Sequence, residues 1–145
     1  LIGEGMEFEE VCRQADICNK ETRLLFTLQS YETLVKNGRM NKFVGMVATK
    51  MNIRAVGRAT EAGELGMLTK ERGEARAFQA LVKQMAKLKS MENLDVYIHH
   101  CMNEQGADMV AELVKVHYPT CRPHIFPCRG LTSYYAENGG ILAGF

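Results

Sequence analysis

Two arginines in this sequence lie next to a glycine where one predicted element ends and another begins. Lys36-Asn37-Gly38-Arg39 separates two apolar, helix-like runs, and Arg72-Gly73 precedes the next helical pattern. An arginine beside the unpaired backbone amides of a helix start can hold a carboxylate or a phosphate. The same residues also suit a plain helix stop at Asn37-Gly38 followed by solvated arginines. The residue types alone leave both interpretations open.

The histidines and cysteines do not follow a metal-site pattern. His99, His100 and Cys101 are consecutive in a predicted strand, where adjacent side chains point to opposite faces. No Cys-x-x-Cys pair occurs, so the sequence predicts no metal site. His100 is instead a candidate for a polar pocket or an ordinary hydrogen-bonded structural histidine. Five cysteines without a signal peptide or a membrane-length apolar run predict reduced thiols and a cytoplasmic location.

An apolar stretch rich in methionine follows Arg39. Met40, Phe43, Val47 and Met51 recur along it. Such residues ordinarily fill an irregular core, and they also suit an adaptable pocket for a long, flexible ligand. No nucleophile–base pairing, Walker loop or Gly-x-Gly-x-x-Gly motif occurs, and no acidic cluster beside either arginine could hold Mg²⁺. Nothing in the sequence therefore requires this chain to be an enzyme.

Composition limits the classes of partner. The 145 residues, 46% of them hydrophobic, suit a single domain over 1–145 that buries its own core. The 18 basic and 17 acidic residues leave a formal charge of +1, which gives no reason to expect nucleic acid binding or stable insertion in a membrane. The opening Leu-Ile-Gly-Glu-Gly, which lacks a methionine, is typical of a piece of a longer protein.

Apolar periodicity predicts about six strands with helices between them. The predicted helices are 8–18, 31–36 (capped by Ser30), 43–47, 73–88 and 103–117; the predicted strands are 22–30, 52–60, 64–70, 94–101, 121–128 and a last one from Ile141. The predicted buried stripes are Ala75, Phe78, Leu81, Val82, Met85 and Leu88 in one helix, and Val110, Leu113, Val114 and His117 in another. Strand 22–30 is mostly apolar and therefore central, whereas the prolines of 121–128 place it at an edge. The fold class is α/β (α+β), two layers, with a mixed, partly antiparallel sheet and helices mainly on one face.

Five segments in order resemble the C-terminal domain of the DegV family of bacterial fatty-acid-binding proteins. They are LIGEGMEFEEV, LFTLQSYETLVKNGRMNKFVGMVATKMNIRAV, GELGMLTKERGEARAFQALVKQM, YIHHCMNEQGADMVAEL and GLTSYYAENGGILAGF. The second is similar to the family segment that ends in Lys-x-Gly-Arg-Ile, and the third to the family hairpin that closes on Lys-x-Arg-Gly. Together they cover essentially the whole chain.

The resemblance implies a carrier rather than an enzyme. Such proteins have two α/β domains with one long-chain fatty acid in the crevice between them. Hydroxyl residues of the N-terminal domain, which is missing here, hold the carboxylate. The carrier presents the fatty acid to a separate ATP-dependent fatty acid kinase, which makes acyl phosphate for phospholipid synthesis. No cofactor is implied beyond the bound fatty acid.

The resemblance also implies roles for particular residues. The expected fatty-acid-binding residues are Met40, Phe43, Val47, Met51 and Tyr135. Arg39 and Arg72 correspond to basic residues near the pocket mouth and the kinase-docking surface, and His100 matches a family histidine of unspecified role. Many members carry a histidine where this chain has Tyr134-Tyr135-Ala136, and a tyrosine can donate a hydrogen bond to a carboxylate but carries no positive charge. The family Gly-Pro-Gly is replaced by Asn138-Gly139-Gly140.

Two alternatives remain at this stage. One is a protein-interaction domain without a lipid ligand, and the other is a phosphotransferase-related module in which Arg39 and Arg72 clamp phosphate. For the carrier, one domain supplies only one wall of the crevice, so the isolated chain is expected to bind fatty acid weakly or not at all.

Overall fold

The computed structural model describes residues 2–38, 52–60 and 62–145. The helices are α1 (Phe8–Glu21), α2 (Glu32–Lys36), α4 (Glu74–Leu88), α5 (Glu104–His117) and α6 (Gly130–Ala136), with a short 3-10 turn, η1 (Ile2–Glu4). The strands are β1 (Leu24–Thr27), β2 (Ile53–Ala59), β3 (Leu65–Arg72), β4 (Asp95–His100), β5 (Arg122–Pro127) and β6 (Ile141–Gly144). The predicted short helix at 43–47 lies outside the described residues.

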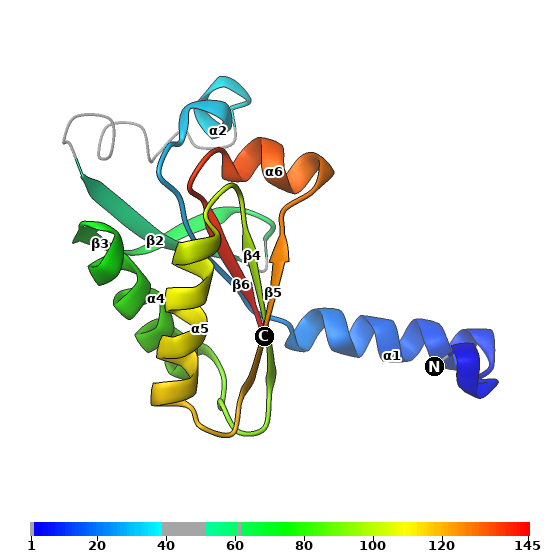
Figure 1. Cartoon of the computed structure of the whole chain (residues 1–145). Helices are drawn as coiled ribbons and strands as arrows, with labels where there is room; N and C mark the ends of the chain where they lie inside the picture. The colour runs from blue at the N-terminus through cyan, green and yellow to red at the C-terminus, as the bar shows by residue number, and fades with distance from the viewer. Residues whose placement is uncertain (1, 39–51, 61) are drawn as a thin grey trace.

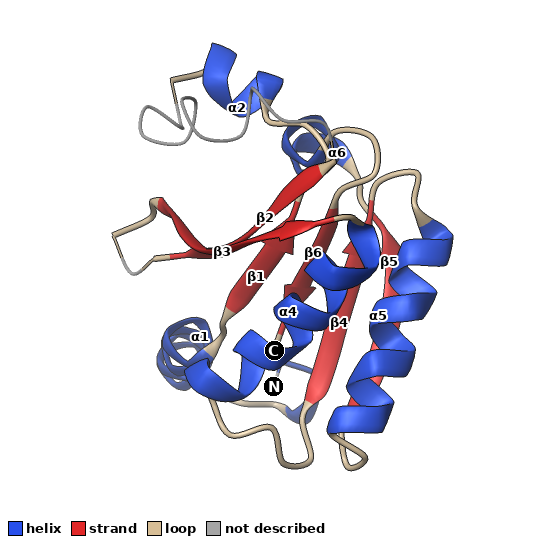
Figure 2. Ribbon diagram, turned by 90° about the vertical axis from the view of Figure 1, so that its left-hand side faces the viewer, coloured by secondary structure: helices blue, strands red, loops and turns tan. Residues whose placement is uncertain are grey.

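The strands form one mixed sheet in the order β3-β2-β1-β6-β4-β5 (Figure 2). β4 and β5 are parallel, and the other neighbouring pairs are antiparallel. β1 lies between β2 and β6, and β5 lies at an edge, as the apolar run and the two prolines predict. The α/β class with a six-stranded, partly antiparallel sheet is therefore confirmed.

Helices α4 and α5 cover one face of the sheet and bury the main core (Figure 2). Its fully buried members include Leu25, Val56, Phe78, Leu81, Met85, Val96, Ile98, Val110, Val114 and Ile141. These residues come from both helices and from alternate positions of the strands, because side chains of a strand point alternately to its two faces. The described helices are too short or too polar to cross a bilayer.

Two residues of the predicted helix stripes are exposed. Ala75 is exposed, and Ala77, which the predicted stripe leaves out, is fully buried. His117 is the last residue of α5 and is exposed. Both wrong assignments fall in a terminal turn, where the helical pattern is least constrained by packing.

A second cluster of apolar residues lies on the opposite face of the sheet, near α2 and α6. Its buried members are Phe26, Leu28, Tyr31, Leu34, Ala55 and Ala136, and the partly buried residues that pack against them are Leu65, Met67, Cys101, Cys128, Tyr135 and Leu142. The β2–β3 register shifts between Val56 and Gly57, where β3 has one extra residue, Leu68, and the ring of Phe26 packs directly over Gly57. No helix as long as α4 covers this face in the described part of the chain.

Helix α1 projects away from the sheet, on the side away from α4 and α5 (Figure 1). The helical spacing of its apolar residues is confirmed, yet none of them is buried. The side chain of Phe8 is 75% exposed. The amphipathic pattern of α1 is therefore not used for packing within the described residues.

Candidate functional site

The second cluster is the part of the fold to which the predicted apolar pocket residues connect. Arg39, Met40, Phe43, Val47 and Met51 lie outside the described residues. The elements on both sides of them are described, because α2 ends just before Gly38 and β2 begins just after Asn52. Leu34 of α2 and Ala55 of β2 are both buried in the second cluster. The described elements that flank 39–51 in sequence therefore both contribute to this cluster.

The Asn37-Gly38 pair ends α2, as the sequence predicts. The backbone amides of Asn37 and Gly38 donate to the carbonyls of Thr33 (3.1 Å) and Val35 (3.0 Å). Gly38 has a φ of +66°, a conformation that favours glycine. The helix-stop interpretation of this turn is confirmed, and it leaves open the role of the arginine that follows.

Tyr135 lies in α6 and packs against the second cluster. Its ring meets that of Tyr134 edge to face, with centroids 5.2 Å apart. The Tyr134 hydroxyl accepts a hydrogen bond of 3.1 Å from the side-chain amide of Asn37. The structure thus brings the helix that carries Tyr135 beside the turn that precedes Arg39, although the two are about a hundred residues apart in sequence.

Glu137, which follows α6, caps α2. Its carboxylate accepts a hydrogen bond of 2.7 Å from the backbone amide of Thr33, and the Ser30 hydroxyl also donates to it. Partial burial acts to raise the pKa of Glu137, but these hydrogen bonds outweigh it and the pKa lies below its ordinary value. Ser30 accepts from the amide of Glu32 (3.3 Å), so the predicted cap is shared between Ser30 and Glu137. The sequence gives no signal for Glu137, because it reaches α2 from the other end of the chain.

Arg72 is the last residue of β3 and is exposed. It pairs with Ile53 across the β2–β3 hairpin, and the amide of the next residue, Gly73, donates to the Asn52 carbonyl (2.8 Å). Arg72 therefore lies beside the point where the chain re-enters β2 from the segment that contains Arg39. The roles of Arg39 and Arg72 stay predictions.

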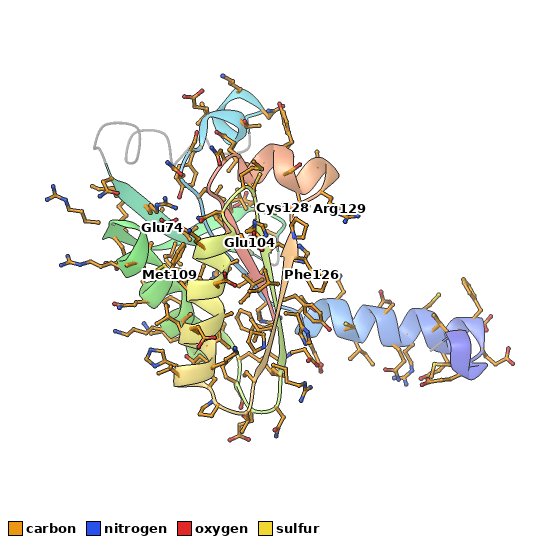
Figure 3. The ribbon with its side chains drawn as sticks, viewed as in Figure 1. Glu74, Glu104, Met109, Phe126, Cys128 and Arg129 are labelled. Carbon is orange, nitrogen blue, oxygen red and sulfur yellow. The ribbon has the colours of Figure 1, made fainter. Side chains whose placement is uncertain are left out.

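A buried arginine that is not among the predicted site residues connects β2 to the start of α4 and to the turn before β6. Arg54 in β2 is 8% exposed, and its Nη1 lies 3.2 Å from Glu74 Oε1 at the start of α4 and 3.4 Å from the Gly139 carbonyl. Asn103 Nδ2 donates to the same Glu74 oxygen (2.7 Å) and to Gly139 (3.2 Å), while Asn103 Oδ1 caps α5 at Gly106 (3.0 Å). Figure 3 shows Glu74 and Glu104, at the starts of α4 and α5, on the same side of the molecule. The alternation of β2 already placed Arg54 on the same face as Val56, which was the available signal.

His100 lies apart from Tyr135. The alternation of β4 places His100 on the face of Ile98, which α4 and α5 cover, whereas Tyr135 packs on the opposite face. The Nδ1 atom of His100 accepts a hydrogen bond of 3.3 Å from the Asn103 backbone amide. His100 therefore helps to position the start of α5. Across the described ranges, no group of three or more potential metal ligands occurs.

Solved structures of similar proteins define the class to which this α/β domain belongs. The Fatty Acid Kinase (Fak) B3 protein of Streptococcus pneumoniae, loaded with linoleic acid, matches with a TM-score of 0.89 and 36% identity, over 100% of this chain and 51% of that chain. A DegV family protein from Eubacterium eligens, loaded with heptadecanoic acid, matches with a TM-score of 0.89 and 34% identity, over 99% of this chain and 51% of that chain. The class is that of DegV fold proteins.

Sequence comparisons agree. A family model described as "Uncharacterised protein, DegV family" matches residues 1–143. A DegV domain-containing protein of Streptococcus pyogenes serotype M3 is 40% identical over 145 residues, which are 100% of this chain and 51% of the relative. The chain belongs to the DegV family, and it spans about half the length of the curated relatives it matches. The resemblance stated from the five motifs is confirmed.

Proposed function

We propose that this chain is a fatty-acid-binding carrier domain that forms one wall of an acyl-chain crevice. The observation that carries the proposal is the second cluster, an apolar surface on the sheet face that α4 and α5 leave uncovered. Two relatives that share this fold at 34% identity or more hold linoleic acid and heptadecanoic acid. The other wall would come from an N-terminal half like that of the longer relatives.

The apolar surface suits a long acyl chain. Met67, Leu65 and Leu142 are only partly buried in the second cluster, so they can contact a further apolar group. Each methylene removed from water contributes about 0.8 kcal/mol, so an acyl chain covered on both sides would bind tightly. Met40, Phe43, Val47 and Met51 complete this wall in the proposal, because α2 and β2, which flank them in sequence, both contribute to the cluster.

The polar groups have separate roles in the proposal. Tyr135 donates a hydrogen bond toward the carboxylate in place of the histidine of other members, and hydroxyl residues of the N-terminal half hold the rest of the carboxylate. Arg39 and Arg72 face an acidic surface of a fatty acid kinase, to which the carrier presents the fatty acid for acyl-phosphate formation. The chain itself is not an enzyme and needs no cofactor in this scheme, and it acts in the cytoplasm.

The first test is native mass spectrometry of the full-length protein, followed by denaturing extraction. We expect a co-purified mass in the fatty-acid range. An empty protein that also fails to bind added oleate and palmitate would overturn the carrier proposal in favour of a protein-interaction domain, for which the exposed apolar residues of α1 provide a surface.

A pair of matched variants tests the position of the crevice. Met67→Gln removes an apolar contact from the second cluster, whereas Met109→Gln makes the same change on α5, where Met109 is 44% exposed. We expect Met67→Gln to weaken oleate binding by roughly 5- to 30-fold, equivalent to about 1–2 kcal/mol, and Met109→Gln to leave it unchanged. Equal effects of the two variants would place the crevice elsewhere.

Presentation to a kinase is tested separately. With ATP, Mg²⁺ and a fatty acid kinase, Arg72→Glu should lower acyl-phosphate formation while oleate affinity stays the same. Acyl phosphate formed by this protein without a kinase would show that it is an enzyme. If Arg72→Glu lowers oleate affinity as well as acyl-phosphate formation, Arg72 belongs to the fatty-acid-binding site instead.

A further inference from the structure

The parallel strands β4 and β5 carry a ladder of paired side chains on the uncovered face of the sheet. Tyr97 lies opposite His124, and their rings stack with centroids 5.3 Å apart. His99 lies opposite Phe126, and these rings stack at 5.6 Å. Directly opposed residues on one sheet face are therefore in side-chain contact at two successive positions.

Two cysteines continue this ladder. Cys101 follows β4 two positions after His99, and Cys128 follows β5 two positions after Phe126. The amide of Cys128 donates to the His100 carbonyl (2.7 Å), so the parallel pairing extends past the end of β5. Both cysteines pack against the second cluster, which places them on the same face. They are thus the third opposed pair, and Figure 3 shows Cys128 just beyond Phe126, where the chain turns into α6.

This arrangement meets the geometric need of a disulfide. Neighbouring strands are about 4.8 Å apart, and the Cα atoms of disulfide partners are usually about 4.4–6.8 Å apart. The other cysteines have no such neighbour: Cys12 and Cys18 are exposed on α1, six positions apart and on different faces, and Cys121 is buried and donates to the Met91 carbonyl (2.9 Å). All five are free thiols in the structure.

We propose that Cys101 and Cys128 are a redox pair that forms a reversible intramolecular disulfide. The oxidant is a low-molecular-weight disulfide such as oxidised glutathione. One cysteine thiolate attacks a sulfur of the oxidant and releases one glutathione thiol. The other cysteine then attacks the mixed disulfide and releases the second glutathione. The two protein thiols lose two electrons and two protons, and the oxidant is reduced to two thiols.

The surroundings of Cys128 favour the oxidised state. Burial and the neighbouring Cys101 raise the pKa of Cys128 to about 11, so its thiolate is poorly stabilised at neutral pH. A disulfide whose cysteines form stabilised thiolates on reduction is strongly oxidising, whereas a disulfide whose thiolates are poorly stabilised resists reduction. The same protonation slows attack by Cys128, so oxidation is expected to take minutes to hours rather than seconds.

Oxidation would act on the wall proposed to hold the acyl chain. The Cys101 thiol donates to the Ser133 carbonyl of α6 (3.7 Å), and the Cys101 backbone pairs with Gly139 (2.8 Å) and Gly140 (2.9 Å). A disulfide removes the thiol donor and links the end of β5 to this turn, on either side of the helix that carries Tyr135. Any effect on lipid affinity rests on the proposed function, whereas formation of the disulfide does not.

The test is peptide mapping after incubation of the lipid-free protein with oxidised glutathione and alkylation of the remaining thiols. We expect one cross-linked peptide that joins Cys101 to Cys128 and disappears after reduction with dithiothreitol. Cys101→Ser and Cys128→Ser should each abolish it, while the matched control Cys12→Ser should retain it. If a serine variant fails to fold, the peptide map of the wild-type protein still tests whether the cross-link forms.

Three outcomes would overturn the proposal. They are full alkylation of both Cys101 and Cys128 after incubation, glutathione adducts that never resolve to a cross-link, and a disulfide between other cysteines. If the cross-link forms in a protein that binds no fatty acid, the redox pair is retained and the carrier function fails. The two proposals are therefore separable.

Discussion

The buried guanidinium of Arg54 is paired with one carboxylate, that of Glu74. Removal of this carboxylate tests how much the pair contributes to the stability of the fold. Glu74→Ala leaves Arg54, which is 8% exposed, without its negative partner at 3.2 Å. Breaking one side of a buried ion pair typically costs about 3–5 kcal/mol. The Glu74 side chain is 39% exposed, so water screens part of the interaction, and the Gly139 carbonyl remains as an acceptor. We therefore expect a loss of about 2 kcal/mol of unfolding free energy.

The assay is urea denaturation monitored by far-ultraviolet circular dichroism, with Glu112→Ala as the matched control. Glu112 and Lys115 form a shorter contact of 2.8 Å, but their side chains are 69% and 55% exposed. An exposed pair of this kind contributes at most about 0.5 kcal/mol. If Glu74→Ala destabilises the protein no more than Glu112→Ala, burial of an ion pair does not matter more for stability here than the distance between its charged atoms. The double variant Arg54→Met/Glu74→Ala should recover part of the loss, because no unpaired charge is then left inside.

Two further predictions concern the cap of α2 and the close packing of Phe26 against Gly57 of β2. Glu137→Gln should destabilise the protein by about 1 kcal/mol at neutral pH, because the charged cap of α2 is lost. The folded-state pKa of Glu137 is lowered, so its contribution to stability is complete above the ordinary value of 4.5 and is lost as the pH falls through the folded-state pKa. In thermal denaturation, the stability difference between wild type and Glu137→Gln should therefore narrow below pH 4.5. A difference that stays constant with pH would contradict a charged cap as its cause. Gly57→Ala should destabilise the protein by about 1–3 kcal/mol, because the added methyl group overlaps the Phe26 ring. Adding Phe26→Leu to the same chain should recover part of this lost stability in the same assay. If Gly57→Ala does not change the stability, Phe26 can move aside.

The predictable features of this fold are the ones that local spacing encodes. Apolar periodicity predicted the strands 52–60 and 64–70, which pair as the β2–β3 hairpin, and Gly73 predicted the start of α4. Asn37-Gly38 predicted the end of α2, where the left-handed glycine and the amide bonds are confirmed. Each of these signals involves residues a few positions apart, so no knowledge of the distant chain is needed.

Helix α1 shows where periodicity stops being informative. The spacing of its apolar residues predicted a helix, and the helix is confirmed, but the pattern does not name what the apolar side contacts. Phe8 is exposed within the described chain, while Phe78 of α4 is fully buried, although both occupy apolar positions of amphipathic helices. Only the position of each helix relative to the sheet separates the two cases.

By itself the sequence determined the family, the α/β fold class and most element boundaries, because five motifs in order and short-range periodicity carry that information. The tertiary structure alone decided which polar and reactive side chains meet. It buried Arg54 beside Glu74, brought Glu137 to an amide 104 residues away, and placed Cys101 opposite Cys128 on parallel strands. These contacts follow from the strand order and register, which place distant segments about 4.8 Å apart and which no local pattern specifies.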